Sequence, residues 1–461
     1  MMRKNIAYFL AAILTLAGTV TGYAQKESVQ PYFELGQLPK LINIMPAPPA
    51  FDSPEFANDI VRYGWGKQQR QDSARVAMAI ADAEWDDMTR LFGLWKDAFG
   101  LEISPTGTPE IYKLLVNSLA TTDPMRKETK AFYHRQRPFE RFDDTMPSHE
   151  EDELRGEGSY PSGHSLRGWG ISLLLAQIAP EHADAIYRRG WDYCNSRVIV
   201  GAHWQSDVDA GRLAASAAVA RMHTSQEYLE DLADARAEYI RIKGVNTKQT
   251  AVGFPHIERI IDAPGDTASY RHYGDVAYYW LAKAERTTPR GAEAVTDTAC
   301  TVNYFLQTYG TCTNIPIDIT STPDISAMVT YLFDKLCDAC SQAKSQTFRK
   351  RPFLRMGEHS ALPEKDQKYS TSSSYPSSHS IIGWGIALAL VEVMPDCQDA
   401  ILQRGYEYGR SRTILGFHFK SDVQAGRLVA AYTLASLHND AEFRKLLAAA
   451  QKEYANSINL E

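Results

Sequence analysis

Apolar residues recur at steps of three and four residues along most of the chain. The segments AMAIADAEWDDMTRLFGLW (77–95) and AGRLAASAAVARM (210–222) show this spacing, whereas stretches in which apolar and polar residues alternate are scarce. A period of three to four residues places apolar side chains on one face of an α-helix, and strict alternation is what a half-buried strand would need. The sequence therefore predicts an all-α fold.

Two continuous apolar runs bear on the cellular location. A short basic start precedes the apolar run 6–17, and the small residues Gly22 and Ala24 follow it. This order is typical of a secretory signal peptide, so we expect residues 1–24 to be cleaved and the mature protein to be periplasmic or secreted. The run IIGWGIALALVEVM (381–394) is too short to cross a bilayer and is expected to form a buried helix, which leaves the protein without a stable membrane anchor.

The helical pattern is written twice in the chain. Three blocks return almost unchanged: KAFYHRQRPFER (130–141) as KSQTFRKRPFLR (344–355), GSYPSGHSLRGWGISL (158–173) as SSYPSSHSIIGWGIAL (373–388), and SRVIVGAHWQSDVDAGR (196–212) as SRTILGFHFKSDVQAGR (411–427). The offset is 214 residues at the first block and 215 at the other two. Each copy approaches 200 residues, which is the size of a whole domain.

We therefore expect two tandem, homologous helical-bundle domains. The predicted organisation is an N-terminal extension (25–50), a first copy (51–240), a linker (241–265) rich in glycine and proline, and a second copy (266–461). Two similar domains on one chain can pack like the subunits of a two-fold homodimer, and we expect such pseudo-dimeric packing here.

Composition changes this picture only slightly. Hydrophobic residues make up 44% of the chain and the net charge is −7, so there is no reason to expect a nucleic acid as partner. Six cysteines would meet an oxidising compartment after export, where disulfides persist. Cys337 and Cys340 lie on a helical pattern without a preceding strand, which favours a structural disulfide or two buried thiols over a redox pair.

The first repeated block carries two cations. Lys130 and Arg137 stand seven residues apart, about two helical turns, so we expect both side chains on one face of a helix that Pro138 ends. A solvated basic face would explain one such pair. Its repetition as Lys344 and Arg351 argues for a function.

The second block predicts an anion site at the start of a helix. Free backbone N–H groups and a partial positive charge gather there, and a serine adds a hydroxyl donor. A histidine at this mouth could act on a bound anion. The residues are Ser162, Gly163 and His164 in the first copy and Ser377, Ser378 and His379 in the second.

The third block supplies an arginine, a histidine and an aspartate. His203 follows Arg197 by six residues and precedes Asp207 by four, which is one helical turn. A nucleophilic imidazole needs one nitrogen free and the other held as a donor, and a carboxylate is the usual group that fixes that tautomer. The second copy carries the same residues as Arg412, His418 and Asp422.

Gathered in one pocket, the three blocks form a strongly cationic site. Burying so much like charge is costly unless an anion joins it, and the guanidinium fork matches a tetrahedral oxyanion. Phosphate is the natural occupant, and small-molecule phosphate esters are the expected substrates. This scheme needs no metal, and the sequence contains no H-E-x-x-H or spaced Cys/His motif that would predict one.

At these residues the chain resembles the phosphatidic-acid-phosphatase type 2 superfamily, whose signature is K-x6-R-P, P-S-G-H and S-R-x5-H-x3-D. The sequence around the blocks is most similar to the class A nonspecific acid phosphatases of bacteria. The resemblance implies an all-α domain of the acid phosphatase and vanadium haloperoxidase type, acting through a phosphohistidine at two similar sites. One departure from the signature is Ser378, which stands where the pattern has glycine.

The resemblance also implies a role for each matched residue. His203 would attack phosphorus, Asp207 would orient it and His164 would protonate the leaving group; Lys130, Arg137, Ser162, Gly163 and Arg197 would hold the phosphoryl oxygens. In the second copy the same roles would fall to His418, Asp422 and His379, with Lys344, Arg351, Ser377, Ser378 and Arg412 on the oxygens.

Two other functions fit the same motifs. A vanadium-dependent haloperoxidase would bind vanadate in the same anion site, since vanadate mimics phosphate; otherwise no cofactor is expected. Alternatively, one copy could be catalytically silent and serve the other as a structural or binding domain, although neither copy has lost a signature residue other than the glycine.

The two copies differ in charge just before the P-S-x-H motif. The stretch 139–160 holds eight acids and two arginines, for a net charge of 2 − 8 = −6, whereas 353–375 holds three acids and three bases, for a net charge of 3 − 3 = 0. If these stretches border the sites, we expect the two sites to differ in substrate preference.

Overall fold

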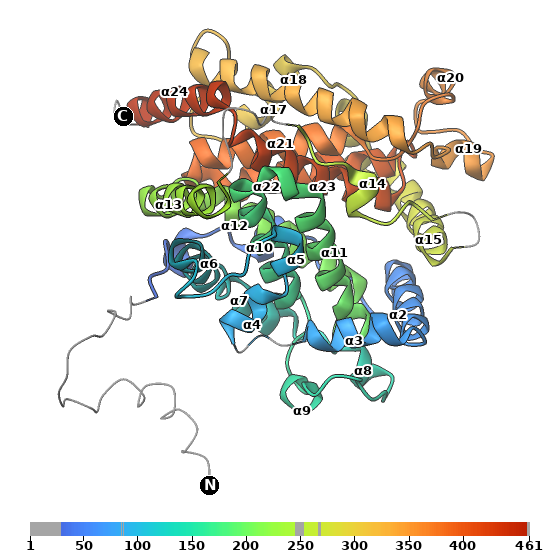
Figure 1. The fold of residues 1–461 in the computed structure, drawn as a ribbon. Helices are drawn as coiled ribbons and strands as arrows, with labels where there is room; N and C mark the ends of the chain where they lie inside the picture. Colours follow the sequence, from blue (N-terminus) through green and yellow to red (C-terminus); the bar gives the residue numbers. More distant parts are fainter. Residues whose placement is uncertain (1–28, 84, 86, 245–252, 266–268, 459–461) are drawn as a thin grey trace, which may run out of the picture.

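The computed structural model describes residues 29–458 apart from 84, 86, 245–252 and 266–268. Every regular element in these residues is a helix, which confirms the all-α fold class. The predicted signal peptide, residues 1–24, lies outside the described residues. Figure 1 shows the N-terminal half, blue to green, lying against the C-terminal half, yellow to red.

Thirteen α-helices are described before residue 245. They are α1 (Leu41–Ile44), α2 (Ala57–Gln69), α3 (Ser73–Ala81), α4 (Met88–Gly93), α5 (Lys96–Phe99), α6 (Pro109–Thr122), α7 (Met125–Tyr133), α8 (Pro138–Arg141), α9 (Glu151–Leu154), α10 (Gly163–Ile178), α11 (Ala183–Ile199), α12 (Gln205–Met222) and α13 (Gln226–Lys243).

Eleven more are described after residue 252. They are α14 (Ile257–Ile260), α15 (Tyr270–Ala284), α16 (Pro289–Thr296), α17 (Val302–Gly310), α18 (Pro323–Gln346), α19 (Pro352–Met356), α20 (Asp366–Tyr369), α21 (Ser378–Val393), α22 (Gln398–Ile414), α23 (Lys420–Leu437) and α24 (Ala441–Ile458).

The equivalent helices α10 and α21 lie at the centre of their copies. Nearly every residue of both is buried, which explains why their apolar residues cover the whole circumference rather than one stripe. Ser162 and Ser377 cap them, each hydroxyl accepting a hydrogen bond from the third backbone N–H of its helix. Among the described residues, no helix is long and apolar enough to span a membrane.

The prediction that one helix carries Lys130 and Arg137 is wrong. The backbone of His134 turns left-handed, with φ at 41°, and α7 therefore ends at Tyr133. Pro138 does not end a helix but opens the short helix α8. Proline suits a first helical position because its missing N–H would have no partner there. The second copy also breaks before its arginine: α18 ends at Gln346, Thr347 is extended, and Pro352 opens α19.

The N-terminal extension crosses to the second copy. Leu41 and Ile44 of α1 are buried, and α1 packs on α22. Asp399 at the start of α22 accepts hydrogen bonds from the backbone N–H of Lys40 (3.0 Å) and from the side chain of Asn43 (2.8 Å). The extension is therefore part of the interface between the copies.

Part of the predicted linker makes the reciprocal contact. Ile257 and Ile260 of α14 are buried, and α14 packs on α11 of the first copy. Asp184 at the start of α11 accepts a hydrogen bond of 2.7 Å from the backbone N–H of His256. Residues 253–265 are thus not a bare connection: they are an arm equivalent to the N-terminal one.

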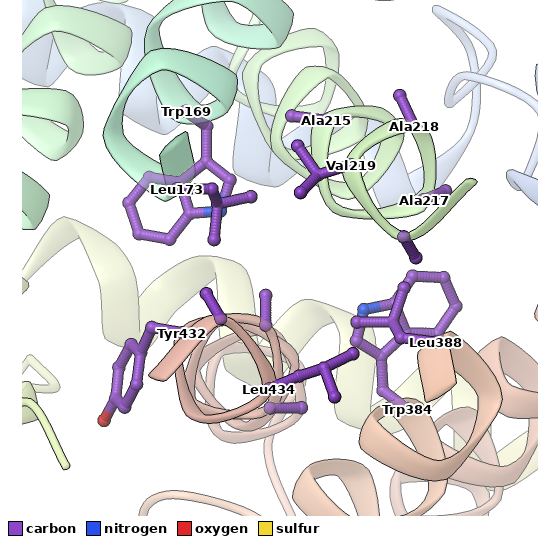
Figure 2. Packing of buried hydrophobic residues seen from close by; sticks show 14 of the residues in the cluster. Trp169, Leu173, Ala215, Ala217, Ala218, Val219, Trp384, Leu388, Tyr432 and Leu434 are labelled. Carbon is purple, nitrogen blue, oxygen red and sulfur yellow. The ribbon is translucent and has the colours of Figure 1, made fainter. Parts of the chain in front are cut away.

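The central helices of the two copies also meet reciprocally. Helix α10 packs on α23 and α12 packs on α21, which are equivalent pairs with the copies exchanged. Figure 2 shows Trp169 and Trp384 within this apolar interface, and the indole N–H of Trp384 donates to the hydroxyl of Ser216 at 3.3 Å. Reciprocal contacts of this kind characterise an isologous, two-fold interface.

A polar cluster lies inside this interface. The rings of His223 and His438 stack at 3.7 Å, and the Nε2 atoms contact Gln177 (2.9 Å) and Glu392 (3.1 Å), respectively. Burial raises the pKa of Glu392 to about 8 and lowers the pKa of each histidine to about 3, so all are neutral at pH 7. One metal ion could not lie in the planes of both nearly parallel rings, so the cluster is a polar contact rather than a metal site.

The state of the cysteines distinguishes between the structural disulfide and the two thiols that the sequence left open for Cys337 and Cys340. All six are free thiols, so Cys337 and Cys340, which both lie on α18, form no disulfide. Cys340 is buried and its thiol donates a hydrogen bond of 2.8 Å to the hydroxyl of Ser378.

Replacing Glu392 should make the stability of the protein depend less strongly on pH between pH 5 and pH 9. The unfolded chain releases this proton at about pH 4.3, whereas the folded protein holds it up to about pH 8, so wild type should lose stability as the pH rises between these values. In Glu392→Gln the drop in Tm from pH 5 to pH 9 should be smaller by at least about 2 °C.

Gln177→Glu, the symmetry-related change, serves as the control. It adds a second buried acid and should make the same drop larger. Parallel Tm curves for wild type and both variants would show that the raised pKa has no bearing on the interface.

Candidate anion site

The three sequence blocks converge on one buried place in each copy. In the first copy, the backbone N–H of Ser162 donates to the carbonyl of Asp207 at 3.0 Å, which joins the helix start to the third block. The guanidinium of Arg137 donates to the carbonyl of Ala202 at 2.9 Å, which joins the first block to the third. The second copy has the same two contacts, Ser377 to Asp422 and Arg351 to Phe417, each at 3.0 Å.

The tautomer of His203 follows from its neighbours. Its Nε2 lies 3.2 Å from Nη1 of Arg137. A guanidinium can only donate, so Nε2 carries the lone pair and Nδ1 the proton. Burial, together with Arg137 and Lys130, lowers the pKa of His203 well below its usual value, so the ring is neutral. His418 meets Arg351 at the same 3.2 Å and has its pKa lowered in the same way.

The carboxylate contact predicted for the nucleophile is long. Oδ2 of Asp207 lies 3.4 Å from Nδ1 of His203, and in the second copy Asp422 is 3.7 Å from His418. The nearer partner of His418 Nδ1 is the backbone carbonyl of Ser374, at 2.7 Å. In the second copy a carbonyl, not the predicted aspartate, therefore holds the tautomer.

The cations of the site are desolvated. Burial and the neighbouring Arg137 lower the pKa of Lys130 well below its usual value, and burial with Arg197 lowers the pKa of Arg137 to about 10. In the second copy the pKa of Lys344 falls to about 8, chiefly through burial. Desolvated, mutually repelling cations bind an anion strongly because each gains a partner.

The second predicted histidine lies at the mouth of the helix. His164 stacks on Tyr193, and its Nε2 lies 3.3 Å from the carbonyl of Ala83. Burial, followed by the charge of Arg197, lowers its pKa well below the usual value. His379 is placed in the same way, stacked on Tyr408.

The departure at Ser378 has a steric explanation. Neither Gly163 nor Ser378 has a positive φ, so serine is not strained there. A Cβ on Gly163 would come within 2.7 Å of the Arg126 side chain. The second copy has Cys340 in place of Arg126, and the smaller side chain leaves room for the serine.

Comparison with known proteins agrees with this geometry. The model of the PAP2 superfamily matches the chain twice, over residues 112–231 and 325–445. The protein belongs to the PAP2 superfamily. Both PAP2 matches contain all three blocks, so the resemblance inferred from the motifs is confirmed.

Each individual relative matches about half of the chain. The chain is 37% identical over 249 residues to a non-specific acid phosphatase of Providencia stuartii, spanning 52% of this chain and all of that protein. It is 34% identical over 241 residues to a non-specific acid phosphatase of Salmonella typhimurium, spanning 52% and 93%, and 32% identical over 227 residues to an acid phosphatase of Zymomonas mobilis, spanning 48% and 83%. Half of this chain thus matches nearly a whole relative, as tandem duplication requires.

Sequence reasoning missed an arginine behind each PAP2 site. The buried Arg135 donates to Asp207 through Nη1 (2.6 Å) and to Asp59 of α2 through Nη2 (2.8 Å). Arg349 bridges Asp422 and Asp275 of α15 with the same atoms. The aspartate of the third block therefore pairs mainly with this arginine.

The repeat itself carried the signal for these residues. Both copies have an arginine two positions before the R-P of the first block, in HRQRPF and FRKRPF. Both also have an aspartate at the head of a weaker repeat, DIVRYGWGKQQR (59–70) and DVAYYWLAKAER (275–286). Without the fold, nothing in the sequence tells that these positions meet.

The structure also places an acid in the first PAP2 site that the motifs do not include. Both oxygens of Glu150 accept hydrogen bonds from Arg197, at 2.9 and 3.0 Å, and both side chains are fully buried. The predicted phosphate ligand Arg197 is thus already paired within the protein.

Removing Arg135 should destabilise the protein strongly. Arg135→Gln leaves the buried carboxylates Asp59 and Asp207 without their cation, which costs about 3–5 kcal/mol and lowers Tm by at least about 6 °C. The loss should be smaller at pH 5 than at pH 8, because protonation relieves an unpaired carboxylate. Arg155→Gln, which breaks the exposed pair with Glu151, should change Tm by less than about 2 °C. Equal losses in the two variants would contradict this account.

Proposed function

We propose that the protein is a periplasmic or secreted phosphomonoesterase that hydrolyses small-molecule phosphate esters through a phosphohistidine at two similar sites. The observation that carries the proposal is the fixed tautomer of His203 and His418. In each copy a buried, neutral imidazole turns its Nε2 lone pair toward the cations of the site. The acid phosphatase names of the relatives agree with this activity.

The first half of the reaction forms the intermediate. Nε2 of His203 attacks phosphorus, the bond between phosphorus and the ester oxygen breaks, and the leaving alkoxide takes a proton from protonated His164. Lys130, Arg137 and the N–H groups at the start of α10 stabilise the charge on the phosphoryl oxygens.

The second half returns the enzyme to its starting state. Water attacks the phosphohistidine and gives a proton to the now neutral His164, and the bond between phosphorus and nitrogen breaks. Inorganic phosphate leaves, and His203 is again neutral. His418 and His379 perform the same steps in the second copy.

Removing both nucleophiles tests the mechanism. The double variant His203→Ala/His418→Ala should lose at least about a thousandfold in kcat for phosphomonoesters, whereas each single variant keeps the activity of the other site. Acid quenching during turnover should trap label on histidine in wild type. Near-normal turnover of the double variant would overturn the mechanism.

The same assay tests the two alternatives. Bromide oxidation with added vanadate and peroxide, in place of ester hydrolysis, would assign a haloperoxidase. One inactive single variant beside one fully active one would assign a silent copy.

We expect a bell-shaped dependence of kcat/KM on pH with an acidic to neutral optimum. The pKa of His203 is lowered by burial and by Arg137, so the nucleophile stays neutral in mild acid. The pKa of His164 is lowered too, so its proton is lost as the pH rises, although the phosphate dianion counteracts this once bound.

Two substrates make this measurement specific. The alkaline limb should be steep for an alkyl phosphate, which needs the proton, and shallow for p-nitrophenyl phosphate, whose leaving group does not. A rate that climbs steadily through pH 9 for both would contradict the assignment of His164.

A further inference from the structure

The two sites differ at the arginine that precedes the proposed nucleophile by six residues, Arg197 in the first copy and Arg412 in the second. In the first copy Arg197 makes two charge-assisted hydrogen bonds to Glu150, and Glu150 is buried. In the second copy Arg412 is equally buried; its Nε, like that of Arg197, has no hydrogen-bond partner within the described part of the chain, and its Nη1 has none either. Arg412 is 1% exposed, and a buried arginine with unpaired N–H groups favours binding of an anion.

The residue equivalent to Glu150 has the opposite charge. Glu150 is the N-cap of α9, and Lys365 is the N-cap of the equivalent helix α20. The ammonium of Lys365 donates to the hydroxyl of Thr298 at 3.0 Å, and the carbonyl of Thr298 contacts His379 at 3.4 Å. The second copy thus carries a cation, linked to His379 only through Thr298, at the position where the first copy carries the carboxylate that pairs with Arg197.

We propose that Glu150 is a built-in competitor for phosphate, so that the first site binds tetrahedral oxyanions weakly and the second binds them tightly. The inference rests on the proposed function only in assuming that both sites hold a phosphoryl group. To engage Arg197 fully, an oxyanion must displace a carboxylate that already makes two good hydrogen bonds. At Arg412 it displaces no acid.

Net charge alone would not rank the two sites. The first copy also has Arg126 beside Gly163, where the second copy has the neutral Cys340. The ranking comes from pairing: the arginine at the centre of the first site is neutralised, and that of the second is not. Charge-assisted hydrogen bonds of this kind correspond to at least about a tenfold difference in affinity.

The difference deepens the proposed function. A site that holds phosphate tightly works at low substrate concentration but releases its product slowly, whereas a weak site keeps turning over when phosphate accumulates. Together the two copies would cover a wider range of phosphate ester concentration than either does alone.

Binding of inorganic vanadate to the full chain, measured by titration calorimetry, tests the proposal without turnover. Wild type should bind two equivalents with dissociation constants at least about tenfold apart. Arg197→Ala should remove the weaker class and Arg412→Ala the tighter one. Glu150→Gln should tighten the weaker class by about tenfold, and Lys365→Glu should weaken the tighter class.

Glu151→Gln is the matched control. Glu151 is the next residue on α9 and pairs with the exposed Arg155, so this variant should leave both classes unchanged. The variant Glu150→Gln leaves Arg197 unpaired and can reduce stability. The measurement on Lys365→Glu therefore tests the proposal independently of how well Glu150→Gln folds.

Several outcomes would overturn the inference. Loss of the tighter class in Arg197→Ala would show that the first site, not the second, binds vanadate tightly. Vanadate affinities within twofold of wild type in both Glu150→Gln and Lys365→Glu would show that Glu150 does not compete with the anion. Glu150 also lies 3.7 Å from Nε2 of His164. A shifted alkaline limb of kcat/KM in Glu150→Gln with unchanged vanadate affinity would show that Glu150 acts through His164 instead. Tight vanadate binding without ester hydrolysis would refute the proposed function and leave this inference standing.

Discussion

The candidate anion sites depend on one buried arginine behind each of them, Arg135 in the first copy and Arg349 in the second. Each joins the aspartate of the third sequence block to an aspartate of the outer helix, α2 or α15. A buried carboxylate is costly without a cation, and this pair of bonds meets that cost outside the site itself. This leaves Lys130 and Arg137 in the first copy, and Lys344 and Arg351 in the second, desolvated and without that carboxylate as their main partner.

Duplication sets the architecture around these sites. Each copy contributes a short arm, α1 or α14, that packs on the other copy, and the central helices meet in equivalent pairs. Such exchange buries apolar surface that a single copy would expose. The chain thus achieves within one molecule what a symmetric dimer achieves with two, and each half can still change independently, as Glu150 and Lys365 show.

Helical periodicity and the repeat were enough to predict the all-α class, the number of copies and the motif residues that converge in each site. This succeeded because both signals are local: a helix buries a face that recurs every three or four residues, and a duplicated block can be read directly. Local reading failed where backbone geometry intervened. The left-handed turn at His134 ends α7 before Arg137, and a proline expected to end a helix begins one instead.

Only the tertiary structure decided which side chains of the sites pair with which others. Asp207 pairs with Arg135 rather than chiefly with His203, Arg197 pairs with Glu150, and the side chain of Arg126 fills the space beside Gly163. None of these pairs has a spacing that sequence rules recognise. The reason is physical: a buried charge takes whichever opposite charge the packing brings within about 3 Å, and packing joins residues that are distant along the chain. The sequence by itself thus determined which motif residues make up the candidate anion sites, and folding decided which of their charges are already neutralised.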